Sequence, residues 1–191
     1  MNDRAAGERR SEVDVNGESY QHVRGDLVVR PAVASDFDAI ARLTVDAYRS
    51  DGQLAQETGY ERVLADVPSR AAAGEVLVAA DPAGSVVGAV LFVLPGSRYA
   101  ELSGPGEAEF RMLAVDPAAQ SRGVGEALVR ACVERARELG ATSVVIATRD
   151  FSHRAQRLYA RTGFVRLPGR DWSPVPDVNL LAWRLDLLDQ A

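Results

Sequence analysis

The sequence contains no lysine, and all 22 of its basic residues are arginine. A nucleoside-triphosphate loop needs a lysine after its second glycine, so the absence excludes that class of phosphate site. The single cysteine, Cys132, excludes an internal disulfide framework and fits a reducing cytosol. The only histidines, His22 and His153, lie far apart without the spacing of zinc ligands, so we expect no metal site.

Long hydrophobic runs are also missing, although 47% of the 191 residues are hydrophobic. No run approaches the ~20 apolar residues that a membrane helix needs, so we expect no membrane contact. Residues 1–24 are charged and lack the apolar core of a secretory signal, which predicts a disordered N-terminal extension. A solvated tail is favoured there over a partner-binding one. Residues 25–191 are long enough to form one domain. Because neither a secretory signal nor a membrane helix is expected, we expect the protein in the cytoplasm.

The charge balance is acidic, with a net charge of −5 and a pI near 5.1. An acidic chain is poorly suited to binding a phosphate backbone, so we expect no nucleic-acid partner. The same charge is compatible with a cationic amine as substrate.

Hydrophobic patterning predicts a mixed α/β fold, a sheet of about seven strands with flanking helices. The expected strands are residues 27–30, 75–80, 86–94, 108–115, 143–148, 164–167 and 179–187. The expected helices are residues 36–48, 59–73 (bent or broken by Pro68), 126–139 and 152–161. Residues 108–148 read as strand, helix and strand, which implies a parallel pair with a right-handed crossover.

The most informative segment is the glycine turn, residues 120–125, between an expected strand and helix. Gly123 and Gly125 let the backbone approach an anion, and the helix start directs unpaired N–H groups at the same place. Arg122 adds a side chain that can bond a phosphate twice. A dinucleotide fingerprint is excluded because Leu128 occupies its third glycine position. The turn predicts a pyrophosphate site, and a plain helix start is the alternative.

Residues 109–117, the glycine turn and residues 155–164, in this order along the chain, resemble the GNAT N-acetyltransferase superfamily. The glycine turn matches its [QR]-x-x-G-x-[GA] motif, and residues 109–117 precede it as in that family. Residues 155–164 are similar to its A-x-x-L-Y-x-x-x-G-F motif, and residues 29–32 resemble its opening. The resemblance runs from about Leu27 to the C-terminus.

This resemblance implies a fold whose two central parallel strands splay apart, with the pantetheine arm of acetyl-CoA in the gap. It implies that the main chain of Leu113, Ala114 and Val115 pairs with that arm. It also implies that the pyrophosphate is held by N–H groups of the turn, which consists of Gln120, Ser121, Arg122, Gly123, Val124 and Gly125. Ser152 stands where the family often has a cofactor-contacting asparagine, although a helix-capping role is favoured for it.

The resemblance also suggests the chemistry. Tyr159 lies at the family's general-acid tyrosine, where a phenol can protonate the leaving thiolate; aromatic packing is the alternative. Glu109 occupies the position where some members carry the general base. Glu101 is a weaker candidate for that role, and other members use water chains.

The acceptor is the least defined part of the prediction. Tyr99, Glu101 and Trp172 are candidate substrate-binding residues, and Trp172 beside Asp171 would suit a cation. A small amine, an antibiotic and a peptide N-terminus all remain open. The alternative to an enzyme is a catalytically silent acyl-CoA-binding sensor. The alternating C-terminal strand makes a homodimer possible.

Overall fold

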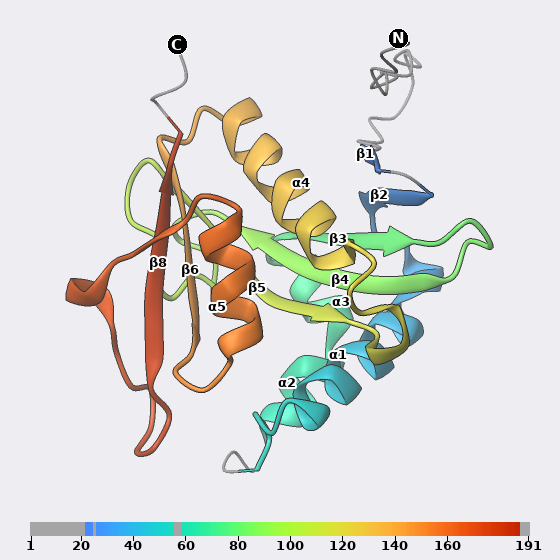
Figure 1. Cartoon of the computed structure of the whole chain (residues 1–191), viewed down its shortest axis with the longest axis horizontal. Helices are drawn as coiled ribbons and strands as arrows, with labels where there is room; N and C mark the ends of the chain where they lie inside the picture. The colour runs from blue at the N-terminus through green and yellow to red at the C-terminus, as the bar shows by residue number, and fades with distance from the viewer. Residues whose placement is uncertain (1–21, 25, 56–58, 188–191) are drawn as a thin grey trace, which may run out of the picture.

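The computed structural model describes residues 22–24, 26–55 and 59–187, which form one eight-stranded sheet with helices on both faces (Figure 1). The strands are β1 (His22–Arg24), β2 (Leu27–Pro31), β3 (Glu75–Ala80), β4 (Val86–Val93), β5 (Glu107–Val115), β6 (Ser143–Arg149), β7 (Val165–Arg166) and β8 (Leu180–Asp186). Their order is β1-β2-β3-β4-β5-β6-β8-β7, and β5–β6 is the parallel pair among antiparallel neighbours. The α/β fold class is therefore confirmed.

The eighth strand comes from the segment expected to be a disordered extension. His22–Arg24 form β1 and pair with β2, while residues 1–21 lie outside the described part of the chain. A strand of three residues is too short to show an alternating pattern. The other seven strands fall within the ranges expected from the sequence, to within one or two residues at each end.

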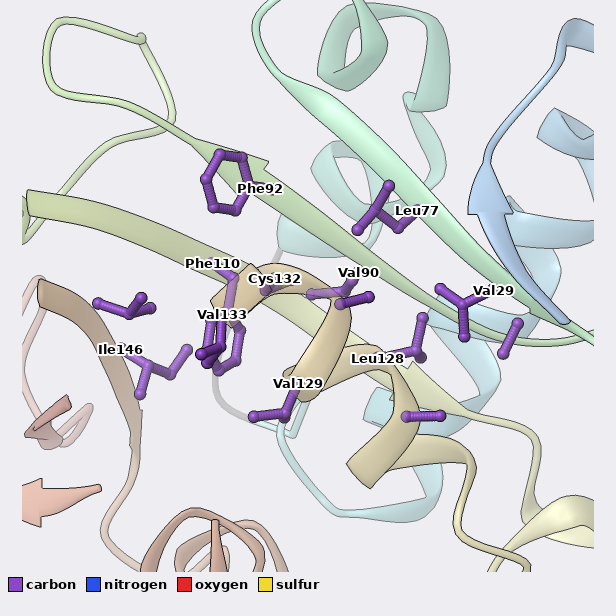
Figure 2. Close-up of a cluster of buried hydrophobic side chains, with 14 of the residues drawn as sticks. Val29, Leu77, Val90, Phe92, Phe110, Leu128, Val129, Cys132, Val133 and Ile146 are labelled. Atoms are coloured by element: carbon purple, nitrogen blue, oxygen red, sulfur yellow. The ribbon is translucent and has the colours of Figure 1, made fainter. Parts of the chain in front are cut away.

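The helices divide between the two faces of the sheet. The first group is α1 (Phe37–Ser50), α2 (Tyr60–Ala65) and α3 (Val67–Ala71), and the second is α4 (Val124–Glu138) and α5 (His153–Arg161). The first group packs on β3, β4 and the end of β5 around Ile40, Leu64 and Leu91. The second group closes the other core, where Figure 2 shows Leu128 and Cys132 of α4 over the sheet.

The break between α2 and α3 differs from the expectation. The interruption falls at Asp66 (φ −80°, ψ 71°) rather than at Pro68, which lies in the first turn of α3. Proline is tolerated there because the first N–H groups of a helix have no partner within it. Asp66 also accepts a hydrogen bond from the Ser69 amide at 3.1 Å, which fixes the start of α3.

The central parallel pair opens after only three residue pairs. Glu107–Glu109 of β5 align with Ser143–Val145 of β6, and beyond them β5 stays with β4 while β6 stays with β8. Next to the opening, the β4–β5 register shifts and Met112 has a φ of 52°. An extra residue in a strand reverses which face the following side chains occupy. Accordingly, Phe110 packs in the core with α4, whereas Met112 and Ala114 pack in the core with α1.

We predict that Gly88→Ala destabilises the fold, because Gly88 of β4 lies directly under the start of α4. A Cβ at this position would lie 2.6 Å from Val124 Cγ1, 3.0 Å from Leu128 Cδ1 and 3.2 Å from the Ala114 carbonyl oxygen. Overpacking of this kind costs about 1–3 kcal/mol. Urea unfolding measures the loss, and Gly169→Ala is the matched control because a Cβ there meets nothing within 4 Å. Equal stability of the two variants would contradict the prediction.

Candidate active site

A cavity of about 670 Å³ lies between the diverging end of β5 and helix α5. Pockets for small molecules and cofactors are typically ~300–1,000 Å³, so its size suits a ligand of that kind. Four segments line it: the end of α1 and the residues after it, the end of β5, the glycine turn with the start of α4, and one face of α5. The lining residues are Ala47, Tyr48, Asp51, Gln53, Leu113, Ala114, Val115, Ala119, Gln120, Ser121, Gly123, Val124, Gly125, Glu126, Arg154, Ala155, Arg157, Leu158 and Arg161.

The glycine turn brings the start of α4 to the cavity. Ser121 and Gly123 both have left-handed backbones, with φ of 66° and 83°, so the chain reverses tightly before the helix. The Ala127 amide donates to the Gly123 carbonyl at 2.9 Å. The N–H groups of the preceding residues, Val124 to Glu126, therefore come before the first helical hydrogen bond and point out of the helix end. Such an end favours a negatively charged ligand.

Gly125 leaves room at this helix start. A Cβ on Gly125 would lie 3.2 Å from Leu158 Cδ2 and 3.6 Å from Val115 Cγ2. The three residues come from α4, α5 and β5, so the elements that border the cavity meet here. A larger side chain at position 125 would have to project into the cavity or displace its walls.

Most of the predicted cofactor-binding residues lie together on this cavity. Leu113, Ala114 and Val115 line it from β5, and the glycine turn lines it with Gln120, Ser121, Gly123, Val124 and Gly125. Arg122 is exposed and does not line the cavity.

Arg154 is the arginine that contacts the turn. Its guanidinium donates to Gln120 Oε1 and, at 3.3 Å, to Ser121 Oγ. The sequence analysis did not identify Arg154, Arg157 or Arg161 as site residues. Their spacing of three and four residues along an expected helix could have indicated that they share one face.

The predicted N-cap position of Ser152 on α5 is confirmed, but the expected capping hydrogen bond from its side chain is not formed. The Ser152 Oγ is buried and makes no hydrogen bond to the part of the chain that the structure describes. Ser152 also does not line the cavity. Its expected contact with a cofactor stays a prediction.

Tyr159 follows the cavity-lining Leu158 on α5 but points into the core. Its side chain is 3% exposed, and its ring packs 5.8 Å from Phe110, 6.0 Å from Phe164 and 6.3 Å from Trp183 between centroids. Burial, and to a smaller extent the Cys132 thiol, raises the pKa of the phenol well above its usual range. The hydroxyl therefore keeps its proton at neutral pH. A general acid must hold a proton, but a raised pKa also makes the phenol a weaker donor. Tyr159 does not line the cavity, and its role as general acid stays a prediction.

Glu109 is 1% exposed and is bonded within the protein. Its carboxylate accepts hydrogen bonds from the amides of Glu101 at 3.1 Å, Leu102 at 2.9 Å and Ser103 at 2.9 Å. It also lies 3.8 Å from Arg111 Nε. These contacts hold the loop before β5, and Glu109 does not line the cavity. Its assignment as general base stays a prediction, while the geometry supports a positioning role.

Glu109→Gln separates these two roles. The amide keeps one acceptor oxygen but places an NH₂ group where backbone N–H groups converge, so we expect the free energy of unfolding to fall by about 2 kcal/mol. Denaturant unfolding and the pH dependence of turnover should be measured together. A variant of unchanged stability that loses the acidic limb of the pH–rate profile would identify Glu109 as the base.

The predicted substrate residues form no common pocket around the cavity. Tyr99 and Glu101 are held by Arg111, whose guanidinium donates to the Tyr99 carbonyl at 2.7 Å and pairs with the Glu101 carboxylate at 2.7 Å. Trp172 bridges to Leu180 of β8. The neighbouring Asp171 is engaged by Arg166 at 2.8 Å and by the Ala182 amide at 2.8 Å. Asp171 is therefore poorly suited to the cation site suggested for it and Trp172.

The described residues form neither a membrane-spanning helix nor a cluster of metal ligands. None of the helices in residues 22–24, 26–55 and 59–187 is long and apolar enough to cross a membrane. Within the same ranges, no group of three histidine, cysteine or acidic side chains is placed to hold a metal ion. Cys132 is buried in the core on α4, and burial raises the pKa of its thiol well above the usual range. It is therefore a packing residue rather than a nucleophile.

Part of the chain is similar in sequence to a known acetyltransferase. Mycothiol acetyltransferase from Propionibacterium freudenreichii subsp. shermanii is 34% identical over 89 residues, which are 47% of this chain and 27% of that protein. The chain thus spans about a quarter of the length of this curated relative.

Solved structures cover nearly the whole fold. A GCN5-related N-acetyltransferase from Kribbella flavida superposes with a TM-score of 0.65 at 24% identity, over 85% of this chain and 98% of that one. The YncA protein from Salmonella typhimurium, solved with its cofactor acetyl-CoA, gives 0.59 at 22% identity, over 87% and 97%. The model of the acetyltransferase (GNAT) family matches residues 37–164, most of the domain, and the chain therefore belongs to that family.

Proposed function

We propose that this protein transfers the acetyl group of acetyl-CoA to a primary amine in a ternary complex. The observation that carries the proposal is the cavity itself. One wall is the end of β5, which is paired with β4 but no longer with β6, and the other side presents the start of α4 with its glycine turn. The edge of β5 that faces β6 can bond an amide-containing arm as another strand would, and a helix start suits a diphosphate. Membership of the family and the acetyl-CoA-bound neighbour support the same ligand.

In this mechanism, Leu113, Ala114 and Val115 hold the pantetheine arm through their main chain, and the glycine turn holds the diphosphate. A general base, Glu109 or a water molecule, takes a proton from the attacking amine, whose nitrogen bonds to the thioester carbonyl carbon. The C–S bond breaks, and the sulfur leaves as a thiolate. Tyr159 donates its phenolic proton to that thiolate and regains a proton from the base, so the products are the amide and the free thiol of coenzyme A. An unperturbed thiol ionises near pH ~8.5 and already leaves well, so the contribution of the acid is expected to be ~10²–10⁴-fold.

The acceptor is an amine whose identity the fold does not specify. Because the relative from Propionibacterium freudenreichii is a mycothiol acetyltransferase, the panel of acceptors includes a thiol-containing amine. Small primary amines, aminoglycoside-type antibiotics and peptides with free N-termini complete the panel. We also propose that the protein forms a homodimer, which gel filtration tests directly.

Release of free thiol from acetyl-CoA in the presence of each amine tests the function. Because Cys132 is buried, the native protein adds little background to a thiol assay. We expect saturable, amine-dependent release with at least one class of acceptor. Tight acetyl-CoA binding without release for any amine would instead indicate the alternative, a sensor that has kept the cofactor site and lost the chemistry.

A further inference from the structure

Three arginines line the same side of the cavity from α5. Arg154, Arg157 and Arg161 are three and four residues apart, which places them on one face of the helix. The whole chain carries a net charge of −5, so this face is a local concentration of the opposite sign. A cluster of positive charge at a cavity rim raises the local concentration of an anionic ligand.

The three side chains differ in what they contact. Arg154 donates to Gln120 and Ser121 of the glycine turn. Arg161 lies 3.7 Å from Glu126 Oε2, and the same carboxylate bonds Arg130 at 3.1 Å. Arg157 has neither a hydrogen bond nor an ion pair within the described residues, although it lines the cavity. Its guanidinium is thus available to a ligand.

Arg157 lies on α5, near the start of α4, and does not belong to the glycine turn. The adjacent Leu158 reaches to within 3.2 Å of where a Cβ of Gly125 would lie. Arg157 lies three residues after Arg154, about 4.5 Å further along the helix axis at 1.5 Å per residue. Its charge is therefore displaced along α5 from the contact that Arg154 makes with the turn.

Coenzyme A carries two separate phosphate groups. The diphosphate has oxygens that backbone N–H groups can hold, as the glycine turn is placed to do. The 3′-phosphate on the ribose is a monoester with a second pKa near ~6, so it bears close to two negative charges at neutral pH. Arginine is well suited to such a group because its planar fork can donate two hydrogen bonds to phosphate oxygens.

We propose that Arg157, flanked by Arg154 and Arg161, binds the 3′-phosphate of coenzyme A and makes the protein select coenzyme A over 3′-dephospho-coenzyme A. The inference rests on the proposed function, since it takes the cavity to be the coenzyme A site. The glycine turn and the α5 arginines then bind different groups of the ligand. The turn binds the diphosphate, and the arginines bind the 3′-phosphate on the ribose. Arg157 is then a specificity-determining residue.

A cycle of two proteins and two ligands tests this assignment. Calorimetry at one fixed, low ionic strength gives the affinities of the wild-type protein and of Arg157→Gln for coenzyme A and for 3′-dephospho-coenzyme A. We expect the wild type to bind the dephospho compound about tenfold or more weakly, since a hydrogen-bonded charge pair is worth roughly that factor. Arg157→Gln should bind coenzyme A with a similar loss and should barely distinguish the two ligands.

Arg137→Gln is the matched control, since Arg137 lies in the last turn of α4, away from the cavity, and its replacement makes the same change in charge. It should keep the full preference for coenzyme A. Equal losses for both ligands in Arg157→Gln would mean that Arg157 acts on the diphosphate, and would overturn the proposal. So would a wild-type protein that binds both ligands equally well.

Failure of the inference can be told from failure of the proposed function. If the wild type binds both ligands tightly and equally, the coenzyme A site stands and the role of Arg157 falls. If the wild type binds neither ligand, the cavity is not a coenzyme A site and both ideas fall together.

Discussion

Gly125→Glu should abolish the binding of acetyl-CoA. The new side chain would start 3.2 Å from Leu158 Cδ2 and 3.6 Å from Val115 Cγ2, so its carboxylate has to project into the cavity. There it would occupy the space in front of the free N–H groups of α4 and repel a diphosphate. We expect the affinity to fall by at least about 100-fold, which corresponds to about 3 kcal/mol. Calorimetric titration with acetyl-CoA measures the loss.

Two further variants separate the causes. Gly125→Gln has nearly the same size without the charge, so the difference between the two variants reports the electrostatic part. Gly169→Glu adds the same charge on an exposed residue with nothing within 4 Å of a Cβ, and it should bind as the wild type does. Thermal unfolding shows whether each variant is folded. Wild-type affinity in a folded Gly125→Glu protein would refute the placement of the diphosphate at the glycine turn.

Tyr159→Phe should lower turnover by about 100-fold or more while leaving acetyl-CoA affinity unchanged. Phenylalanine keeps the ring contacts with Phe110, Phe164 and Trp183, so the core should remain packed. The lost group is the hydroxyl, which is the proton donor in the proposed mechanism. Steady-state kinetics with the preferred amine, together with calorimetry for acetyl-CoA, measures both effects.

The pH dependence provides an independent check on Tyr159. Because burial raises the pKa of the phenol, the protonated form persists to a higher pH than for an exposed tyrosine, which titrates near ~10. Ionisation of Tyr159 should therefore cause no loss of wild-type turnover below that pH. Unchanged turnover in Tyr159→Phe at every pH would leave Tyr159 as a core aromatic residue only.

The parts of this molecule that sequence could predict are those determined by local patterns. Continuous apolar runs marked the central strands, and Asp81 and Gly84 marked the hairpin, where Asp81 Oδ1 indeed accepts hydrogen bonds from the Ala83 and Ser85 amides at 3.0 and 2.9 Å. The glycine turn was also predictable, because Gly123 has a left-handed backbone that favours glycine and a Cβ on Gly125 would make a close contact with Leu158.

Other features depend on contacts between distant segments. Glu109 reads as an alternating polar residue of a strand, and only the path of the loop before β5 brings three amides onto its carboxylate. Similarly, Ser152 has the residue type and position of a helix cap, but its hydroxyl is buried without making that bond. Tyr48 and Asp51 lie at the end of α1 and line the cavity, to which the packing of α1 against β5 brings them.

The short β5–β6 contact makes the sheet two half-sheets, one of five strands and one of three, joined across the middle by only three residue pairs. The core around Phe110 and Trp183 and the ion pair between Glu107 and Arg184 also join the two halves. A ligand that bonds to β5 and contacts α5 would add further contacts between them. Its binding would stabilise the domain, since a ligand that binds only the folded form shifts the unfolding equilibrium toward that form.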